Sequence, residues 1–156
     1  MLEIADTLEW LIGTWRVDRE IEDNQTGTRG SLSGVATLLP LSADDVDEYG
    51  IHARYSEEGE LQFGAYAGTA RRSLLYARLD AGSTMVYFAD HRPFIRLNLR
   101  RGACSADHRC GDDRYEITAR VHSHDVLQEQ WRVRGPATDY AARAWLRRLS
   151  SLPSIS

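Results

Sequence analysis

Two charged side chains, Arg19 and Glu129, stand where core-facing apolar residues are expected. Arg19 alternates in phase with Trp15 in "TWRVDREIE", and Glu129 lies between Leu127 and Trp131 in "VLQEQWRVR". An ion buried without a partner costs on the order of several kcal/mol, so each side chain needs a partner or water. The alternation therefore predicts that Arg19 and Glu129 project into the same interior.

Three readings of this pair stay open. The two residues could form a buried salt bridge, because the first strand of a closed barrel neighbours the last ones. They could instead form the polar end of a ligand cavity, in which Arg19 holds a carboxylate, phenolate or enolate. A shift of register would place both outside. If the cavity is catalytic, we expect Glu129 to exchange protons, while Arg19 and the hydroxyl of Tyr115 stabilise an oxyanion.

A second polar group of residues occupies "RRGACSADHRCGDDRY". Cys104, His108 and Cys110 are spaced C-x3-H-x-C, so a zinc site is chemically conceivable, but this spacing fits no common structural zinc pattern. We interpret residues 101–113 as a long loop at a barrel mouth, with His108, Cys110 and Asp113 at the rim of a cavity. The sequence therefore predicts no metal site.

Composition limits the classes of partner. A formal charge of -4 with scattered basic residues argues against nucleic acid, which requires a concentrated basic face. All 19 basic residues are arginine, so no side chain can form a lysine Schiff base. The two cysteines are too few for a disulfide scaffold, and neither a signal peptide nor a membrane span is recognisable. We expect a soluble, cytoplasmic protein.

The residues that could carry chemistry are positioned by a series of short alternating runs. Asp6 and Glu9 form the capping box of a short helix that ends near Gly13. Strands are predicted at 14–22, 31–39, 47–55, 60–68, 69–79, 84–90, 94–100, 114–122 and 126–134, with "SEEG" as a hairpin turn. The last segment, "DYAARAWLRRL", could be helix or strand, and we favour strand.

Nine or ten antiparallel strands joined by short hairpins predict an all-β, up-and-down barrel of 8–10 strands behind a short N-terminal helix. Closure into a barrel also removes the exposed edges of an open sheet. We expect one domain over residues 1–150 and a flexible tail at 151–156.

The short helix followed by Gly13 and Trp15 on the first strand resembles the lipocalin or calycin superfamily. The stretches "LIGTWRVDREI", "FGAYAGTARRSLLY", "RPFIRLNL", "HRCGDDRY" and "WRVRGPATDY" also resemble an uncharacterised bacterial domain family of that type. The resemblance implies a barrel that holds an apolar small molecule, with a minority of members acting as cofactor-independent enzymes or haem binders.

The first functional hypothesis is therefore a protein that binds a small apolar molecule with a polar or acidic end. The alternative is a cofactor-independent lyase, isomerase or cyclase that uses Glu129, Tyr115 and Arg19. Haem binding through His91 or His108 is a third possibility, although no cofactor is expected. We expect a possible homodimer, with Trp145 at the contact. The expected ligand-binding residues are Arg19, Trp131, Tyr49, Phe63, Tyr87, Leu97, His108, Cys110 and Asp113.

Overall fold

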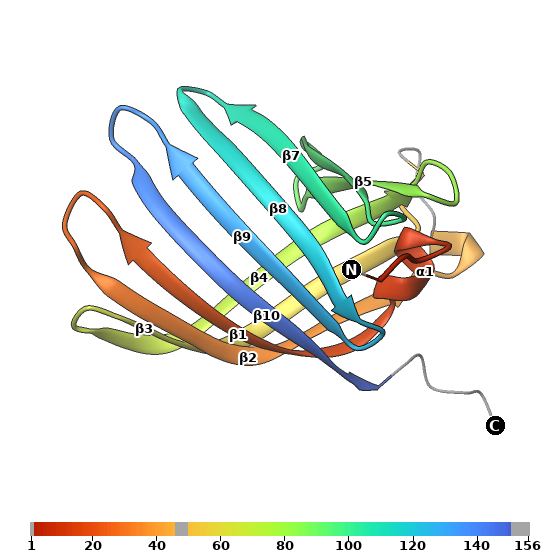
Figure 1. Ribbon diagram of the computed structural model, residues 1–156, viewed down its shortest axis with the longest axis horizontal. Helices are drawn as coiled ribbons and strands as arrows, with labels where there is room; N and C mark the ends of the chain where they lie inside the picture. Colours follow the sequence, from red (N-terminus) through yellow and green to blue (C-terminus); the bar gives the residue numbers. More distant parts are fainter. Residues whose placement is uncertain (1, 46–49, 151–156) are drawn as a thin grey trace.

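Ten antiparallel strands form a single sheet that curls into a nearly closed barrel (Figure 1). The computed structural model describes residues 2–45 and 50–150. Its strand order is β6-β5-β4-β3-β2-β1-β10-β9-β8-β7, so each strand lies beside its sequence neighbours and β1 pairs with β10. The expected up-and-down barrel is confirmed, and the last segment is a strand.

The helix α1 spans Thr7–Leu11, and a short 3-10 turn spans Ala43–Asp45. The strands are β1 (Gly13–Asp23), β2 (Arg29–Pro40), β3 (Ala53–Phe63), β4 (Tyr66–Arg78), β5 (Ser83–Phe88), β6 (Pro93–Asn98), β7 (Ala103–Cys110), β8 (Asp113–Ser123), β9 (Val126–Arg134) and β10 (Asp139–Ser150). Among the described residues, no ladder of backbone hydrogen bonds joins β6 to β7. These two strands meet through side chains along a seam.

One end of the barrel is closed by α1. The Asp6 side chain accepts a hydrogen bond from the Glu9 backbone N–H and so caps the helix, as expected. Trp15 is 1% exposed, and its indole N–H donates to the carbonyl of Leu11. The Arg148 guanidinium lies 4.2 Å from the Trp15 ring centre and donates to the Trp10 carbonyl. Cation–π stacking thus joins the last strand to the first, and the hydrogen bond joins the last strand to α1.

One predicted turn and one predicted loop are wrong. The residues of "SEEG" lie in the middle of β3, and the hairpin between β3 and β4 turns at Gly64, where φ is +60°. The expected loop at 101–113 is mostly strand β7, which pairs with β8 through a turn at Gly111, where φ is +61°. Both turns are two-residue Gly-X connections, the kind that suits the twist of a hairpin.

The strand predicted at 47–55 begins only at Ala53, and residues 46–49 lie outside the described part of the chain. Further along β3, Gly59 pairs with Gly34 of β2. A Cβ added to Gly34 would lie 2.5 Å from the Cα of Gly59, too close for any side chain. These two glycines therefore allow a close approach of β2 and β3 that side chains would prevent.

Candidate functional site

An aromatic wall lines the inside of the barrel toward the end opposite α1. Five strands contribute one ring each: Phe88 from β5, Phe94 from β6, His108 from β7, Tyr115 from β8 and Trp131 from β9. The Phe94 ring lies at the centre, with its centroid 4.5 Å from Phe88, 5.4 Å from His108, 5.7 Å from Tyr115 and 5.4 Å from Trp131. Phe94 is buried, but the other four rings are partly exposed. The wall thus offers apolar surface to a ligand.

Arg72 of β4 crosses the interior to this wall. Its guanidinium carbon lies 4.9 Å from the ring centre of Trp131 and 5.7 Å from that of Tyr55. One terminal nitrogen lies 3.6 Å from the Glu57 carboxylate. The Nε atom of Arg72 is buried and has no hydrogen-bond partner among the described residues. A buried donor without a partner costs about 1–3 kcal/mol, so this N–H is available to an acceptor on a ligand.

Arg19 does not pair with Glu129, contrary to one of the readings of the sequence. It makes a two-point ion pair with Glu57, with N–O distances of 2.7 and 2.9 Å. The Tyr55 hydroxyl donates a third hydrogen bond to Glu57, at 2.6 Å. In the strand register, Ala144 of β10 stands between Arg19 and Glu129. The buried salt bridge expected for Arg19 therefore exists, but its acid is Glu57.

This pair is held in its charged form. Burial alone would raise the pKa of Glu57, but its hydrogen bond with Arg19 and the positive charge of Arg72 outweigh burial and lower the pKa to about 2. Burial would lower the pKa of Arg19, but the same contact with Glu57 raises it above its usual value. Burial also raises the pKa of Tyr55 well above its ordinary value. Tyr55 therefore stays protonated and donates to Glu57.

Glu129 borders a small hollow below the aromatic wall. No hydrogen bond or ion pair joins its carboxylate to another described residue. The hollow measures about 20 Å³, which is enough for one water-sized group. Its lining is mostly apolar and includes Leu97, and the polar side chains around it are Tyr55, Arg72, Tyr76 and Glu129. Arg72 and Glu129, each with an unpaired polar group among the described residues, thus border the same small hollow.

The structure brings some of the predicted site residues together and separates others. Arg19, Glu129, Trp131, Leu97, His108 and Tyr115 all lie on the inner side of the barrel. Tyr87 packs beside Ile51 and Leu75 in a separate cluster on the other side of β4, away from the interior. Phe63 lies at the tip of the hairpin between β3 and β4. Tyr49 lies outside the described residues.

The zinc interpretation fails on geometry, because β7 is extended. At about 3.3 Å per residue, Cys104 and Cys110 stand about 20 Å apart, too far to share one metal ion. No group of three potential ligands is found in the described part of the chain. Arg92 donates to the sulfur of Cys110 at 3.8 Å. Burial, and then the charge of Arg92, lowers the pKa of His108 and favours its neutral ring.

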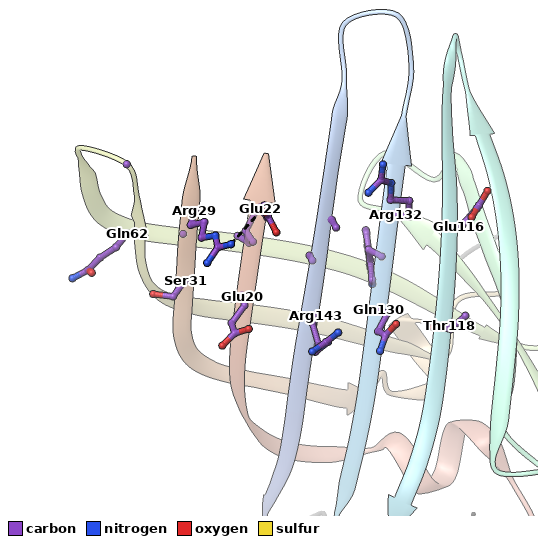
Figure 2. Close-up of a pocket in the computed structure, with 16 residues that line it drawn as sticks. Glu20, Glu22, Arg29, Ser31, Gln62, Glu116, Thr118, Gln130, Arg132 and Arg143 are labelled. Carbon is purple, nitrogen blue, oxygen red and sulfur yellow. Dashed lines mark ion pairs between the residues drawn. The ribbon is translucent and has the colours of Figure 1, made fainter. Parts of the chain in front are cut away.

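A much larger hollow, of about 870 Å³, lies over β8, β9, β10, β1 and β2 (Figure 2). Most residues around it are the outward-facing members of their strands, and they form two rows across the sheet through cross-strand pairs. One row is Gln62, Ser31, Glu20, Arg143, Gln130 and Thr118, and the other is Arg29, Glu22, Ala141, Arg132 and Glu116. We call this hollow the outer groove.

The charges of the outer groove cancel one another. Its three glutamates and three arginines alternate along the two rows, and Arg29 lies 3.7 Å from Glu22. Arg132 binds Asp139 at 2.9 Å, although its Nε is buried without a partner among the described residues. Exposed pairs of this kind are hydrated and screened, so they contribute little to binding or stability. The outer groove therefore has a large volume but no strong electrostatic preference.

Sequence reasoning missed Glu57 and Arg72. Both were missed because the predicted hairpin turn was misplaced. That turn put Glu57 in a loop, and the strand that contains Arg72 was predicted to begin at residue 69, whereas β4 begins at Tyr66. The alternation of Tyr55, Glu57, Gly59 and Leu61 against exposed neighbours would have identified an inward glutamate, and the "FGAY" turn would have placed Arg72 opposite it.

Residues 11–148 match the model of DUF6314, a family of unknown function. No curated protein matches the chain. Among solved structures, the S-type phycobiliprotein lyase of Guillardia theta is 10% identical with a TM-score of 0.63, over 94% of this chain and 92% of the lyase. A DUF3598 protein of unknown function from Nostoc punctiforme is 12% identical with a TM-score of 0.56, over 91% of this chain and 49% of that protein. This chain thus spans about half the length of the Nostoc protein, and at these identities the likeness shows a shared fold.

Proposed function

Because this chain belongs to DUF6314, whose function is unknown, we propose from its own geometry that it binds a small organic molecule inside the open end of the barrel. The observation that carries the proposal is the partly exposed aromatic wall, with the Arg72 guanidinium over its Trp131 ring. The apolar body of the ligand packs against Tyr115 and Trp131. Its polar end reaches the unpaired N–H of Arg72.

Two features support this proposal. The wall collects rings from five strands, so its exposed apolar surface is built by the fold as a whole. The opposite end is sealed by α1 and the Arg148–Trp15 stack, so a ligand would enter from one side.

Separately, no helix among the described residues is long and apolar enough to cross a membrane.

The test is a titration with N-phenyl-1-naphthylamine, a neutral probe that fluoresces in apolar sites. We expect the wild-type protein to enhance its fluorescence, and Trp131→Ala to weaken binding by about tenfold, as the loss of one large aromatic contact implies. The matched control is Gln130→Ala, on the outward side of the same strand, which leaves binding unchanged. Equal binding by the two variants would refute the inner site.

The enzymatic alternative is favoured by one observation, the unpaired carboxylate of Glu129 beside an apolar hollow. The fold is also shared with an enzyme, the phycobiliprotein lyase. Arg19 is occupied by Glu57, so in this alternative Arg72 takes the role of oxyanion holder. If a small molecule that co-purifies with the protein is converted by the wild type, Glu129→Gln should still bind that molecule but should not convert it. Turnover at the wild-type rate in that variant excludes Glu129 as the acid or base.

A further inference from the structure

The charges inside the barrel restrict the polar end of the ligand. Arg19 and Arg72 both contact Glu57, and Glu129 adds a second carboxylate, so two guanidinium groups and two carboxylates leave a formal charge of zero. Glu57 is already satisfied by Arg19, Arg72 and Tyr55. A ligand carboxylate would therefore bring an uncompensated charge toward Glu129, which like-charge repulsion and burial both oppose.

The unpaired groups have opposite hydrogen-bonding character. The Nε–H of Arg72 is a buried donor without a partner among the described residues. The carboxylate of Glu129 is an acceptor with no hydrogen bond or ion pair to any described residue. A head group that accepts from the first and donates to the second would satisfy both without adding charge.

The size of the hollow limits the distance between the acceptor and the donor of the ligand head group. A space of about 20 Å³, bordered by both Arg72 and Glu129, holds one water-sized group, so only the polar edge of a ligand can enter it. A carbonyl oxygen and an N–H on adjacent atoms, held cis, form such an edge, and the rest of the ligand stays at the aromatic wall. Trp131 borders the same hollow and also belongs to the aromatic wall, so a flat ring fused to such a head would lie against it.

We propose that the ligand is a flat aromatic molecule with a neutral donor–acceptor head, such as a lactam or cyclic imide, and this rests on the proposed function. Its carbonyl accepts from Arg72 Nε and its N–H donates to Glu129. Of the polar or acidic end expected from the sequence, this assignment selects the polar one, because Glu57 neutralises the arginine that an acidic end would need.

The experiment compares three probes of nearly equal size by displacement of N-phenyl-1-naphthylamine: 2-quinolone, 2-methoxyquinoline and quinoline-2-carboxylate. The first has the donor and acceptor, the second lacks the donor, and the third is an anion. We expect 2-quinolone to bind about tenfold more tightly than either of the others, since a hydrogen bond to a charged group contributes about that much. Stronger binding of quinoline-2-carboxylate, or equal binding of all three, overturns the neutral head.

Substitutions on the two sides of β9 test whether the preference for 2-quinolone depends on Glu129. Glu129→Leu should reduce the preference for 2-quinolone over 2-methoxyquinoline to near one, with each displacement corrected for that variant's own affinity for N-phenyl-1-naphthylamine. Gln130→Leu, on the outward side of β9, should keep the wild-type preference. A preference that survives Glu129→Leu overturns the assignment, as does binding of N-phenyl-1-naphthylamine without any of the three quinolines. If N-phenyl-1-naphthylamine itself fails to bind the wild-type protein, the proposed function fails first, so the two failures are distinguishable.

Discussion

The inner site and the outer groove share strands β8 and β9, and Trp131 borders both hollows. The outer groove is the larger of the two, but the inner site has the stronger chemistry. The outer groove measures about 870 Å³ and the inner hollow about 20 Å³. Yet the outer side chains are mostly hydrated charges that cancel, whereas the inner ones are aromatic rings and ions removed from water. Charges withdrawn from water interact far more strongly than exposed ones. Volume alone therefore does not identify the site.

The largest difference should appear when neighbouring glutamates of β3 are removed. Glu57→Ala leaves Arg19 buried without its partner and should cost about 3–5 kcal/mol of unfolding free energy. Glu58→Ala, which breaks only the exposed pair with Arg71, should cost less than about 1 kcal/mol. Urea unfolding of both variants measures the contrast. Similar losses in the two variants would mean that the buried pair of Arg19 and Glu57 contributes no more to stability than an exposed pair does.

Acid should destabilise the folded protein in part by protonating Glu57 inside the barrel. The pKa of Glu57 falls from 4.5 to about 2 on folding, so the unfolded chain binds more protons between these values. The stabilisation from Glu57 is complete above pH 4.5 and is lost as pH falls through about 2. Unfolding free energy measured from pH 6 to pH 2 should therefore decline more steeply in the wild type than in Glu57→Gln. Parallel profiles would assign the acid sensitivity to other carboxylates.

Adjacent arginines of β10 offer a smaller contrast at the closed end. Arg148 stacks on Trp15 and donates to the carbonyls of Ile12 and Trp10, so Arg148→Met should cost about 2 kcal/mol. Arg147 is about half exposed and lies 3.7 Å from Asp18, so Arg147→Met should cost less than about 0.5 kcal/mol. Thermal unfolding monitored by near-ultraviolet circular dichroism would report both. A larger loss of stability in Arg147→Met than in Arg148→Met would contradict a stabilising role for the stack of Arg148 on Trp15.

The smallest effect is expected in the outer groove. Neutralising its central cross-strand pair with Glu20→Gln and Arg143→Gln should change the affinity for N-phenyl-1-naphthylamine by less than about twofold, because both side chains are exposed. Fluorescence titration under the conditions used for Trp131→Ala gives a direct comparison. A tenfold loss in this double variant would move the binding site to the outside of the sheet.

The fold could be predicted because alternation is a local property of the chain. The inward sides of β8 and β9, including Ile117 and Trp131, are as expected, and Trp15 closes the barrel. The turn at "SEEG" was wrong because serine and glycine, which are typical turn residues, here lie within a continuous strand. The Gly-X turns of "FGAY" and "CGDD" carried the correct signal.

The partner of Arg19 could not be predicted, because a pair across strands depends on register. A turn misplaced by a few residues changes which side chains face inward and which residue stands opposite them. Once β3 and β4 are paired correctly, Glu57 lies opposite Arg72, and the inner network follows. The homodimer contact at Trp145 stays a prediction, and that side chain packs against His122 at 5.0 Å on the outward side.

The seam between β6 and β7 gives the barrel a property that a fully laddered cylinder lacks. Its circumference is held there by side-chain contacts, including the backbone N–H of Asn98 on the sulfur of Cys104 at 3.5 Å. A barrel that is open along one seam can widen without breaking a backbone ladder, at the cost of the contact between Asn98 and Cys104. The diameter of its interior can therefore adjust to the thickness of a bound molecule.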